Sequence, residues 1–547
     1  MSLEILHRYC CKDSCVTFEI NEKLESMLDI GQKGHYKFNV SLLNPLLFME
    51  LHGIRYDSKL ARERLKEVNF AIYTLQNDLD KLAGYGLDVT KPRQDLENQV
   101  RDICCYKRDH STPKKEYQDN FDKFLRIIRE GDLNKEQVSF LNMELGLSLN
   151  IKGAALKNYL YDTLKLPVQV HRESGQPSTD YLSLLKLSKK SDHPAIRLAI
   201  EIGSLRTRSQ MLAIHADPDG RIRCGYNVVG AETGRLTCYT SPTGSGYNLQ
   251  TIPADDHIYP VDHPLYKGMR DLFVADGDHI MIQCDLKGSD GWTIGAHLNA
   301  LGSSTMLDDL RFGIKPAARI CYMLRHGNDS LKGKQRLEVK ELLKEVKKED
   351  WDYFLSKIGI WGVSYLMGPD LLANQILEES NGKIAISRTD VATFRSAVFN
   401  GYDIKLYHDA MTRRLAKKPV LECDGGFRRR FFGRREEILG KALAHEPQYN
   451  TTRATNLAAM RLWNDPENRL EKARPNYEKT TTTLKAEPLH QIHDALLLQC
   501  KESDLSWTIT KLKQWFDNPL QIAGQSIVIP YASEWGRSWG ELTNEIT

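Results

Sequence analysis

The sequence has few cysteines and no long apolar run, and each shortage excludes a class of protein. Its 547 residues include 11 cysteines, too few for a disulfide-stapled scaffold, and no C-x-x-C pair of the zinc-binding type occurs. No stretch of about 18 uncharged apolar residues is present, and the N-terminal segment lacks the apolar core of a signal peptide. We therefore expect a reducing, cytoplasmic location and no membrane partner.

The sequence also lacks a net charge that would point to a partner. Its 75 Lys and Arg residues against 72 Asp and Glu residues give a formal charge of only +3, so any surface for a polyanion must be local. A composition of 41% hydrophobic and 27% charged residues excludes disordered and collagen-like chains. Because single cores stop growing at roughly 250–300 residues, the length predicts about three or four subdomains.

Hydrophobic periodicity and turn residues give an order of elements. Helices are expected at 43–82, with a glycine stop inside the range, at 84–152 and at 331–358. A further helix beginning near Tyr181 would take Ser178 or Thr179 as its N-cap. A turn-rich stretch leads into the strand-like run HIMIQCDL, and strands return at 480–500. The chain therefore mixes helices with a later sheet.

Two aspartates stand beside apolar strand-like runs, Asp285 in IMIQCDLKGSD and Asp494 in HQIHDALLL. Brought together across a sheet, two such carboxylates could hold a pair of Mg²⁺ ions, one activating an attacking hydroxyl and one neutralising a leaving phosphate. Taken singly, each aspartate is more typical of a turn or a helix cap than of a metal site.

Lys357, Trp361 and Tyr365 recur at i, i+4 and i+8, so they share one helix face, and glycines flank them. A cation and two aromatic rings on one stripe suit a triphosphate held by the lysine and a base stacked on a ring. The alternative is an amphipathic core helix whose lysine reaches out to solvent.

The run GGFRRRFFGRREE interleaves arginines with Phe431 and Phe432. Such alternation can bind a phosphate backbone. In a strand, Arg428 and Arg430 would point to one side and Arg429 to the other, so part of the run can equally be plain solvated surface. Lysines 344, 347 and 348 alternate with glutamates and indicate a solvated helix face.

Six segments stand in one order along the chain: GQPSTD (175–180), AETGRL with YNLQTIP (231–253), CDLKGSDGWTIGAHL (284–298), SKIGIWGVSYLMG (356–368), QIHDA (491–495) and EWGRSWGE (534–541). In this order they resemble the A-family DNA polymerases, the DNA polymerase I family, from about residue 9 to the C-terminus. CDLKGSDGWTIGAHL resembles motif A of that family, SKIGIWGVSYLMG the O-helix of its fingers and QIHDA its motif C. The phrase YLMGP is more similar to bacteriophage members, which would place the protein in the cytoplasm of a bacterial host.

The resemblance implies an α+β fold, a right hand with an antiparallel palm sheet, helical fingers and a helical thumb. The expected divisions are 1–40 as the C-terminal remnant of a 3′–5′ exonuclease domain, 41–200 as connecting helix and thumb, 201–300 as palm with motif A, 301–425 as fingers and 426–547 as palm with motif C.

The same resemblance implies roles for individual residues. Asp285 and Asp494 would bind two Mg²⁺ ions, with the Leu286 carbonyl as a further ligand, and together with Lys357 they would be catalytic. The dNTP-binding residues would be Asp290, Lys315, Lys357, Trp361 and Tyr365. The primer-template contacts would be Arg235, Asn248, Gln250, Arg428, Arg430 and His493. The implied reaction is in-line attack of a primer 3′-hydroxyl on the α-phosphate of a dNTP, in DNA replication.

Three departures from the family pattern bear on activity. Asp290 replaces a Glu that screens against a ribose 2′-hydroxyl, Tyr353 replaces an Arg that contacts the triphosphate, and Ala495 replaces a Glu. The runner-up reading is therefore a polymerase-like DNA-binding protein with weakened catalysis. A related RNA polymerase is a third reading, disfavoured by Tyr365.

The N-terminal segment carries Tyr9 and Asp13, which match the Y-x-x-x-D motif of the proofreading exonuclease. Any helix offers such an i, i+4 pair, and the family's other exonuclease carboxylates lie upstream of this motif. We therefore expect no self-contained exonuclease site here. A separate exonuclease polypeptide or a processivity factor is a candidate partner.

Overall fold

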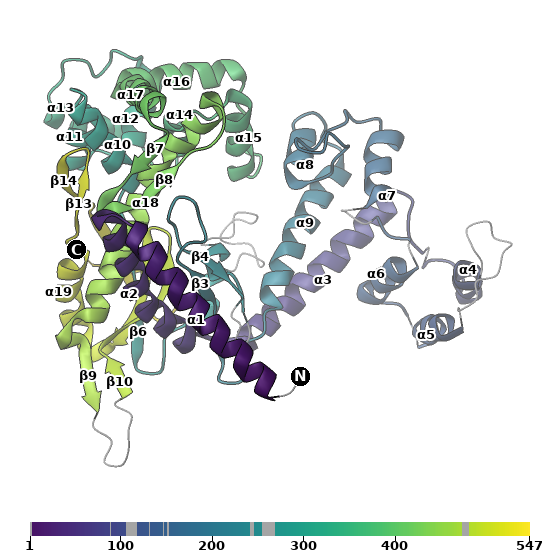
Figure 1. The fold of residues 1–547 in the computed structure, drawn as a ribbon. Helices are drawn as coiled ribbons and strands as arrows, with labels where there is room; N and C mark the ends of the chain where they lie inside the picture. The colour runs from purple at the N-terminus through teal and green to yellow at the C-terminus, as the bar shows by residue number, and fades with distance from the viewer. Residues whose placement is uncertain are drawn as a thin grey trace.

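A computed structural model gives the fold, and helices dominate it around a central antiparallel sheet (Figure 1). The described residues are 3–87, 89–105, 118–130, 132–145, 147–149, 153–240, 246–253, 268–472 and 481–546. The architecture is α+β, as expected from the sequence.

The central sheet has five strands in the order β11-β12-β6-β15-β16, and all neighbouring pairs are antiparallel. Their bounds are β6 His279–Leu286, β11 Ala486–Ile492, β12 Ala495–Lys501, β15 Tyr531–Gly536 and β16 Asn544–Ile546. The helices α2 (Ile30–His52), α18 (Arg435–Asn464) and α19 (Leu505–Phe516) pack on the sheet. Six of the seven residues of β12 are buried, which explains why its sequence is a continuous apolar run rather than an alternating one.

The chain passes from the sheet to the thumb through the order expected from the sequence, a helix, a glycine and a second helix. After α2, Gly53 has φ 67°, and a Cβ there would lie 2.7 Å from the side chain of Arg223, so only glycine fits. The strand β1 (Ile54–Tyr56) then pairs with β2 (Arg221–Ile222) and β5 (Phe273–Val274). Asp57 caps α3 (Ser58–Leu82) by accepting from the backbone of Lys59 and Leu60.

The thumb consists of α3 packed along α9 (Pro194–Leu212), with α8 (Tyr181–Ser188) at its tip. Both figures show α4 (Arg93–Cys105), α5 (Gln118–Arg129) and α6 (Lys135–Glu144) at the far end of α3, where they share a small core of their own. The helix expected near Tyr181 is present. The expected cap was wrong, because Asp180, rather than Ser178 or Thr179, accepts from the Ser183 amide at 2.7 Å.

The fingers are helical and enclose a second hydrophobic core, centred on buried residues such as Phe394 and Tyr407. Their helices are α11 Thr305–Arg311, α12 Pro316–His326, α13 Arg336–Leu342, α14 Trp351–Ser364, α15 Pro369–Glu379, α16 Arg388–Tyr402 and α17 Ile404–Lys417. The region expected to be helical at 331–358 is divided into α13, a 3-10 turn and α14. The thumb tip contacts the fingers, where the Tyr181 hydroxyl donates to Asn381 at 2.6 Å.

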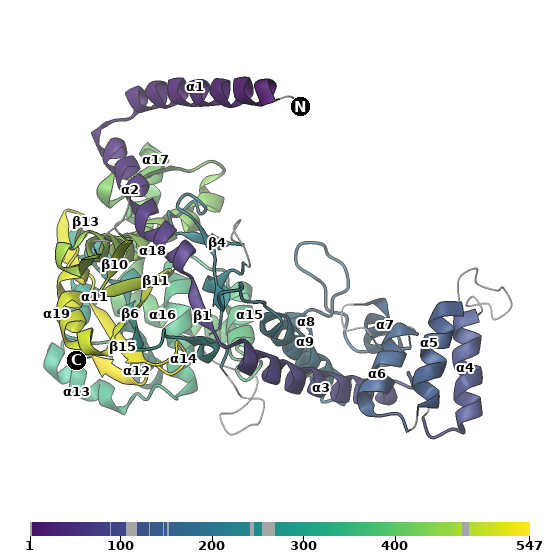
Figure 2. The ribbon, with the colours of Figure 1, turned by 90° about the horizontal axis from the view of Figure 1, so that it is seen from below.

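The helix α1 (Leu3–Met27) projects from the rest of the molecule, and Figure 2 shows it separated from the sheet. Tyr9 and Asp13 lie one turn apart on it and are exposed. The divisions expected at residues 40 and 200 fall inside α2 and α9, so no break between elements occurs at either place. No helix in the described part of the chain is long and apolar enough to cross a membrane.

Candidate active site

The two aspartates singled out in the sequence meet on adjacent strands. Asp285, near the end of β6, is paired in register with Ala495, the first residue of β12. Asp494 immediately precedes β12, and its carbonyl accepts a 3.0 Å hydrogen bond from the Leu286 amide. The structure therefore brings Asp285, Leu286 and Asp494 to one corner of the sheet.

Ionising the carboxyl groups at this corner costs free energy. Burial raises the pKa of Asp285, and the negative charge of Asp494 raises it further. Desolvation by surrounding protein atoms also raises the pKa of Asp494, although its side chain reaches solvent. The charge of Arg270 acts in the opposite direction on Asp285, and the charge of Arg235 does so on Asp494. A bound cation would remove the remaining cost of keeping these carboxylates ionised.

Asp285 is held by a chain of hydrogen bonds that sequence reasoning missed. The side-chain amide of Gln283 donates to Asp285 Oδ2 at 2.7 Å, and the Trp539 indole donates to Gln283 Oε1 at 2.7 Å. Gln283 and Asp285 are two apart on one strand, so they share a face. That spacing is the only signal in the sequence, because Trp539 comes from a distant segment.

A third carboxylate, Asp290, links the sheet to the fingers. It lies in the first turn of α10 (Ser289–Ala300), where the Tyr365 hydroxyl donates to its Oδ2 at 2.7 Å. Thr451 of α18 lies 3.4 Å from its other oxygen. Burial raises the pKa of Asp290, whereas the Tyr365 hydrogen bond lowers it. A Cβ at Gly291 would lie 3.0 Å from the Trp361 ring, so the glycine lets α14 approach α10.

Four lysines from separate segments gather beside the fingers. Desolvation by surrounding protein atoms lowers the pKa of Lys315, which precedes α12, although its side chain reaches solvent. The charges of Lys348, Lys287 and Lys357 lower it further. Lys357 lies on α14 and is exposed, as are the other three. Lys287 and Lys348 were missed by sequence reasoning, which placed Lys348 on a solvated helix face. No linear spacing connects these positions, so the sequence contained no signal for the group.

Four of the six residues expected to touch a primer-template lie near this corner: Arg235, Asn248, Gln250 and His493. His493 occupies the turn between β11 and β12 with φ 47°, an unusual backbone conformation for a residue other than glycine. Gln250 donates to the Gln491 carbonyl at 3.1 Å, and Asn248 caps the short helix that contains Gln250. Arg235 lies close enough to lower the pKa of His493. Their contacts with DNA stay predictions.

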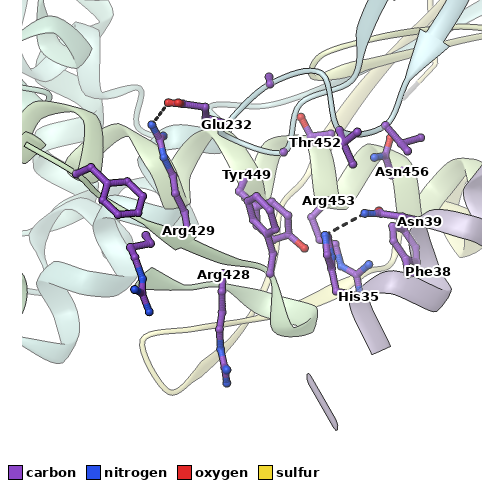
Figure 3. A pocket seen from close by; sticks show the side chains of 17 residues that line it. His35, Phe38, Asn39, Glu232, Arg428, Arg429, Tyr449, Thr452, Arg453 and Asn456 are labelled. Atoms are coloured by element: carbon purple, nitrogen blue, oxygen red, sulfur yellow. Dashed lines mark hydrogen bonds and ion pairs between the residues drawn. The ribbon is translucent and has the colours of Figure 1, made fainter. Parts of the chain in front are cut away.

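The arginine run forms one wall of a pocket of about 420 Å³. Figure 3 shows α2 residues on one side and the run on the other. As expected, β8 (Arg428–Arg430) exposes its first and third side chains and half-buries Arg429. Arg428 pairs with Asp29 and, at 2.7 Å, with Glu422, and Arg429 pairs with Glu232. Part of the positive charge is thus neutralised within the chain.

Ring stacking and a further arginine complete this pocket. Phe427 stacks on Tyr449 with ring centroids 4.7 Å apart, and the Arg453 guanidinium lies 4.0 Å from the ring centre of Phe38. Burial lowers the pKa of His35 to about 4, with a smaller contribution from the charge of Arg453. The imidazole of His35 is therefore neutral near pH 7.

An antiparallel sheet with carboxylates at one corner, flanked by helical fingers and a helical thumb, defines a polymerase-type fold. The model of the family described as DNA polymerase family A matches residues 133–299. Among solved structures, the chain is similar to the POL domain of Pol1 from M. smegmatis, determined in complex with DNA primer-template and dNTP. The TM-score is 0.62 at 17% sequence identity, over 92% of this chain and 70% of that chain.

At this identity the structural likeness shows the fold. The family match, over residues 133–299, stands beside this shared fold as the relationship found at the level of sequence. A comparison with the curated proteins finds no match.

Proposed function

We propose that the chain is a template-directed DNA polymerase that adds dNTPs to a primer 3′-hydroxyl. The observation that carries the proposal is the juxtaposition of carboxylates and lysines. Lys287 follows Asp285 by two residues, and its charge also acts on Lys315. Carboxylates bind hard cations and lysines bind phosphates, so the two groups side by side suit a metal-bound nucleoside triphosphate.

Asp285 and Asp494 would hold two Mg²⁺ ions, with the Leu286 carbonyl as a further ligand. The donor set fits, because it consists of oxygens and because burial and then repulsion from Asp494 raise the pKa of Asp285, a cost that a cation removes. When bound, such ions activate a hydroxyl and neutralise a leaving phosphate. Gln283 would keep the Asp285 carboxylate oriented through its 2.7 Å hydrogen bond.

The fingers would position the nucleotide. Lys357 and Lys315 would bind the triphosphate, and Lys348 and Lys287 would supply the positive charge that Tyr353 cannot. Trp361 and Tyr365 would line the base and sugar pocket. Because Tyr365 is hydrogen-bonded to Asp290, the sugar would meet a carboxylate and a ring that are held together.

The primer-template would lie against the turn that carries His493, with Arg235, Asn248 and Gln250 beside it and with Arg428 and Arg430 on a more distant surface. We further propose a role in replicating a phage genome in the cytoplasm of its bacterial host. This proposal rests on the segment YLMGP (365–369), whose proline is the first residue of α15. Tyr9 and Asp13 on α1 would belong to the proofreading-exonuclease motif that they resemble, and a separate exonuclease or a processivity factor would be a partner.

The test is primer extension with Mg²⁺ and four dNTPs. We expect extension by the wild-type chain and a loss of about three orders of magnitude or more in Asp285→Ala and Asp494→Ala, because the transition-state charge loses its counterion. Extension that persists undiminished in Asp285→Ala would refute the assignment. Tight primer-template binding without extension by the wild type would instead favour the catalytically weakened DNA-binding protein.

A further inference from the structure

A second group of potential metal ligands lies away from the carboxylates, in the palm. Cys224, Cys238 and His490 each offer a ligand atom, and these three atoms all lie within 4.8 Å of one another. The side chains are 3%, 8% and 0% exposed. They come from different segments: Cys224 precedes β3 (Gly225–Asn227), Cys238 lies in β4 (Thr237–Tyr239) and His490 lies in β11.

The polar atoms of this group are incompletely paired. The Tyr226 hydroxyl lies 2.5 Å from His490 Nδ1, whereas His490 Nε2 is buried and has no hydrogen-bond partner among the described residues. Turning the ring over exchanges the two nitrogens without changing its shape, so either one can face the thiols. A buried ring nitrogen without a partner is costly, and a metal would supply the missing bond.

The two thiols lie close together and are buried. Zinc binds cysteine as the thiolate, so binding of the metal would release the thiol protons. Two thiolates and a neutral imidazole would balance the charge of a divalent ion, so the buried site would be neutral overall. A borderline-soft ion with these ligands is Zn²⁺.

We propose that Cys224, Cys238 and His490 form a structural zinc site that fastens the β3–β4 hairpin to strand β11. Ligand atoms around a tetrahedral zinc ion stand roughly 3.5 Å apart, so the observed spacing needs only small side-chain movements. The Tyr226 hydroxyl borders the same space and would fill or hydrogen-bond the fourth position.

The site would couple two parts of the palm. The loop from β3 to β4 carries Arg235, and β11 leads to Asp494 four residues after His490. A metal between them would fix the distance between Arg235 and the Asp494 turn. The site is unrelated to the proposed Mg²⁺ ions, because its donors are sulfur and nitrogen rather than oxygen.

The experiment measures metal in the full chain, purified under reducing conditions without chelator. Elemental analysis should find about one zinc ion per chain, and replacement by Co²⁺ should give thiolate-to-cobalt charge-transfer absorption. Cobalt at the carboxylates cannot give that absorption, so the readout is specific to the cysteines. Primer extension, measured separately, would not decide this question.

Variants give the matched comparison. Cys224→Ser and Cys238→Ser should lose the zinc and the cobalt absorption, while Cys500→Ser, at a buried cysteine of β12 outside the group, should keep both. A folded wild-type chain with neither zinc nor the cobalt absorption would overturn the proposal. A Cys224–Cys238 disulfide would also overturn the proposal. It would be detected if the denatured, metal-free chain had two fewer titratable thiols before reduction than after it. Because the cobalt spectrum is taken on the wild type, a variant that fails to fold does not prevent a decision.

Discussion

Tyr365, the residue directly after α14, donates a 2.7 Å hydrogen bond from its hydroxyl to Asp290 in the first turn of α10. Tyr365→Phe removes the donor from a half-buried carboxylate oxygen, which costs about 1 kcal/mol. If this pair shapes the sugar pocket, KM for dNTPs should rise several-fold and discrimination against rNTPs should change. Steady-state incorporation of dNTP and rNTP measures both.

The matched control for this prediction is Tyr402→Phe. Tyr402 donates to Asp309 at 3.0 Å inside the fingers, so its loss should lower thermal stability in a similar way. Nucleotide selectivity should stay unchanged. Equal effects of the two substitutions on the ratio of dNTP to rNTP incorporation would show that Asp290 has no part in recognising the sugar.

The lysine group predicts an effect at a position that looks like ordinary surface. Lys348→Ala should raise KM for dNTPs roughly three- to tenfold with a smaller change in kcat, because it removes a charge that acts on the triphosphate in the ground state and in the transition state alike. Lys344→Ala is the control, since Lys344 pairs with Glu341 at 2.6 Å on the exposed surface. An unchanged KM in Lys348→Ala would remove this residue from the nucleotide site.

The arginine run predicts a difference between two neighbours in their contribution to DNA binding. Affinity for primer-template should fall steeply with salt. Arg430→Ala should reduce the slope of log affinity against log salt by about one, because Arg430 is exposed and has no ion pair within the described part of the chain. Arg428→Ala should change the slope less, since Asp29 and Glu422 already neutralise that arginine. Titrations at several salt concentrations by fluorescence anisotropy give the slopes, and salt-independent binding would contradict the prediction.

His445 predicts a pH dependence of stability. Burial lowers its pKa to about 4, and neither ring nitrogen has a hydrogen-bond partner among the residues that the structure describes. Because the unfolded chain binds this proton near pH 6.5, the folded protein should lose stability as pH falls from about 6.5 to about 4, by up to about 3 kcal/mol. His445→Phe, which keeps a ring against Phe427 and Phe431, should show a shallower loss in denaturant titrations over that range. Parallel curves for variant and wild type would contradict this assignment.

Much of this architecture was predictable from the sequence, and the exceptions share a cause. The run before Asp285 and the run after Asp494 indicated strands, and their carboxylates meet as expected because adjacent antiparallel strands bring such ends together. The helix stripe of Lys357, Trp361 and Tyr365 was visible as a period. The period of a sequence shows only which residues share a face of a single helix or strand, so contacts between separate elements are missed.

What the sequence could not show is which distant segments share a site. Lys287 and Lys348 join Lys315 through the packing of the fingers on the palm, and the cysteine and histidine group joins a hairpin to a strand far along the chain. A search for closely spaced cysteines therefore could not detect it. The prediction of the N-cap of α8 was wrong for a different reason. Serine, threonine and aspartate are all good N-cap residues, so only the observed backbone decides among Ser178, Thr179 and Asp180.

The position of β6 in the sheet has a consequence for synthesis of the protein. Both of its neighbours, β12 and β15, lie far downstream of it, with the whole of the fingers between. During translation β6 therefore leaves the ribosome with two unpaired edges, and the palm can close only after the fingers have been made. Such non-local pairing is slow. Asp285 would thus stay on an unpaired apolar strand until β12 and β15 have been made, so the corner that carries Asp285 and Asp494 would become ordered late.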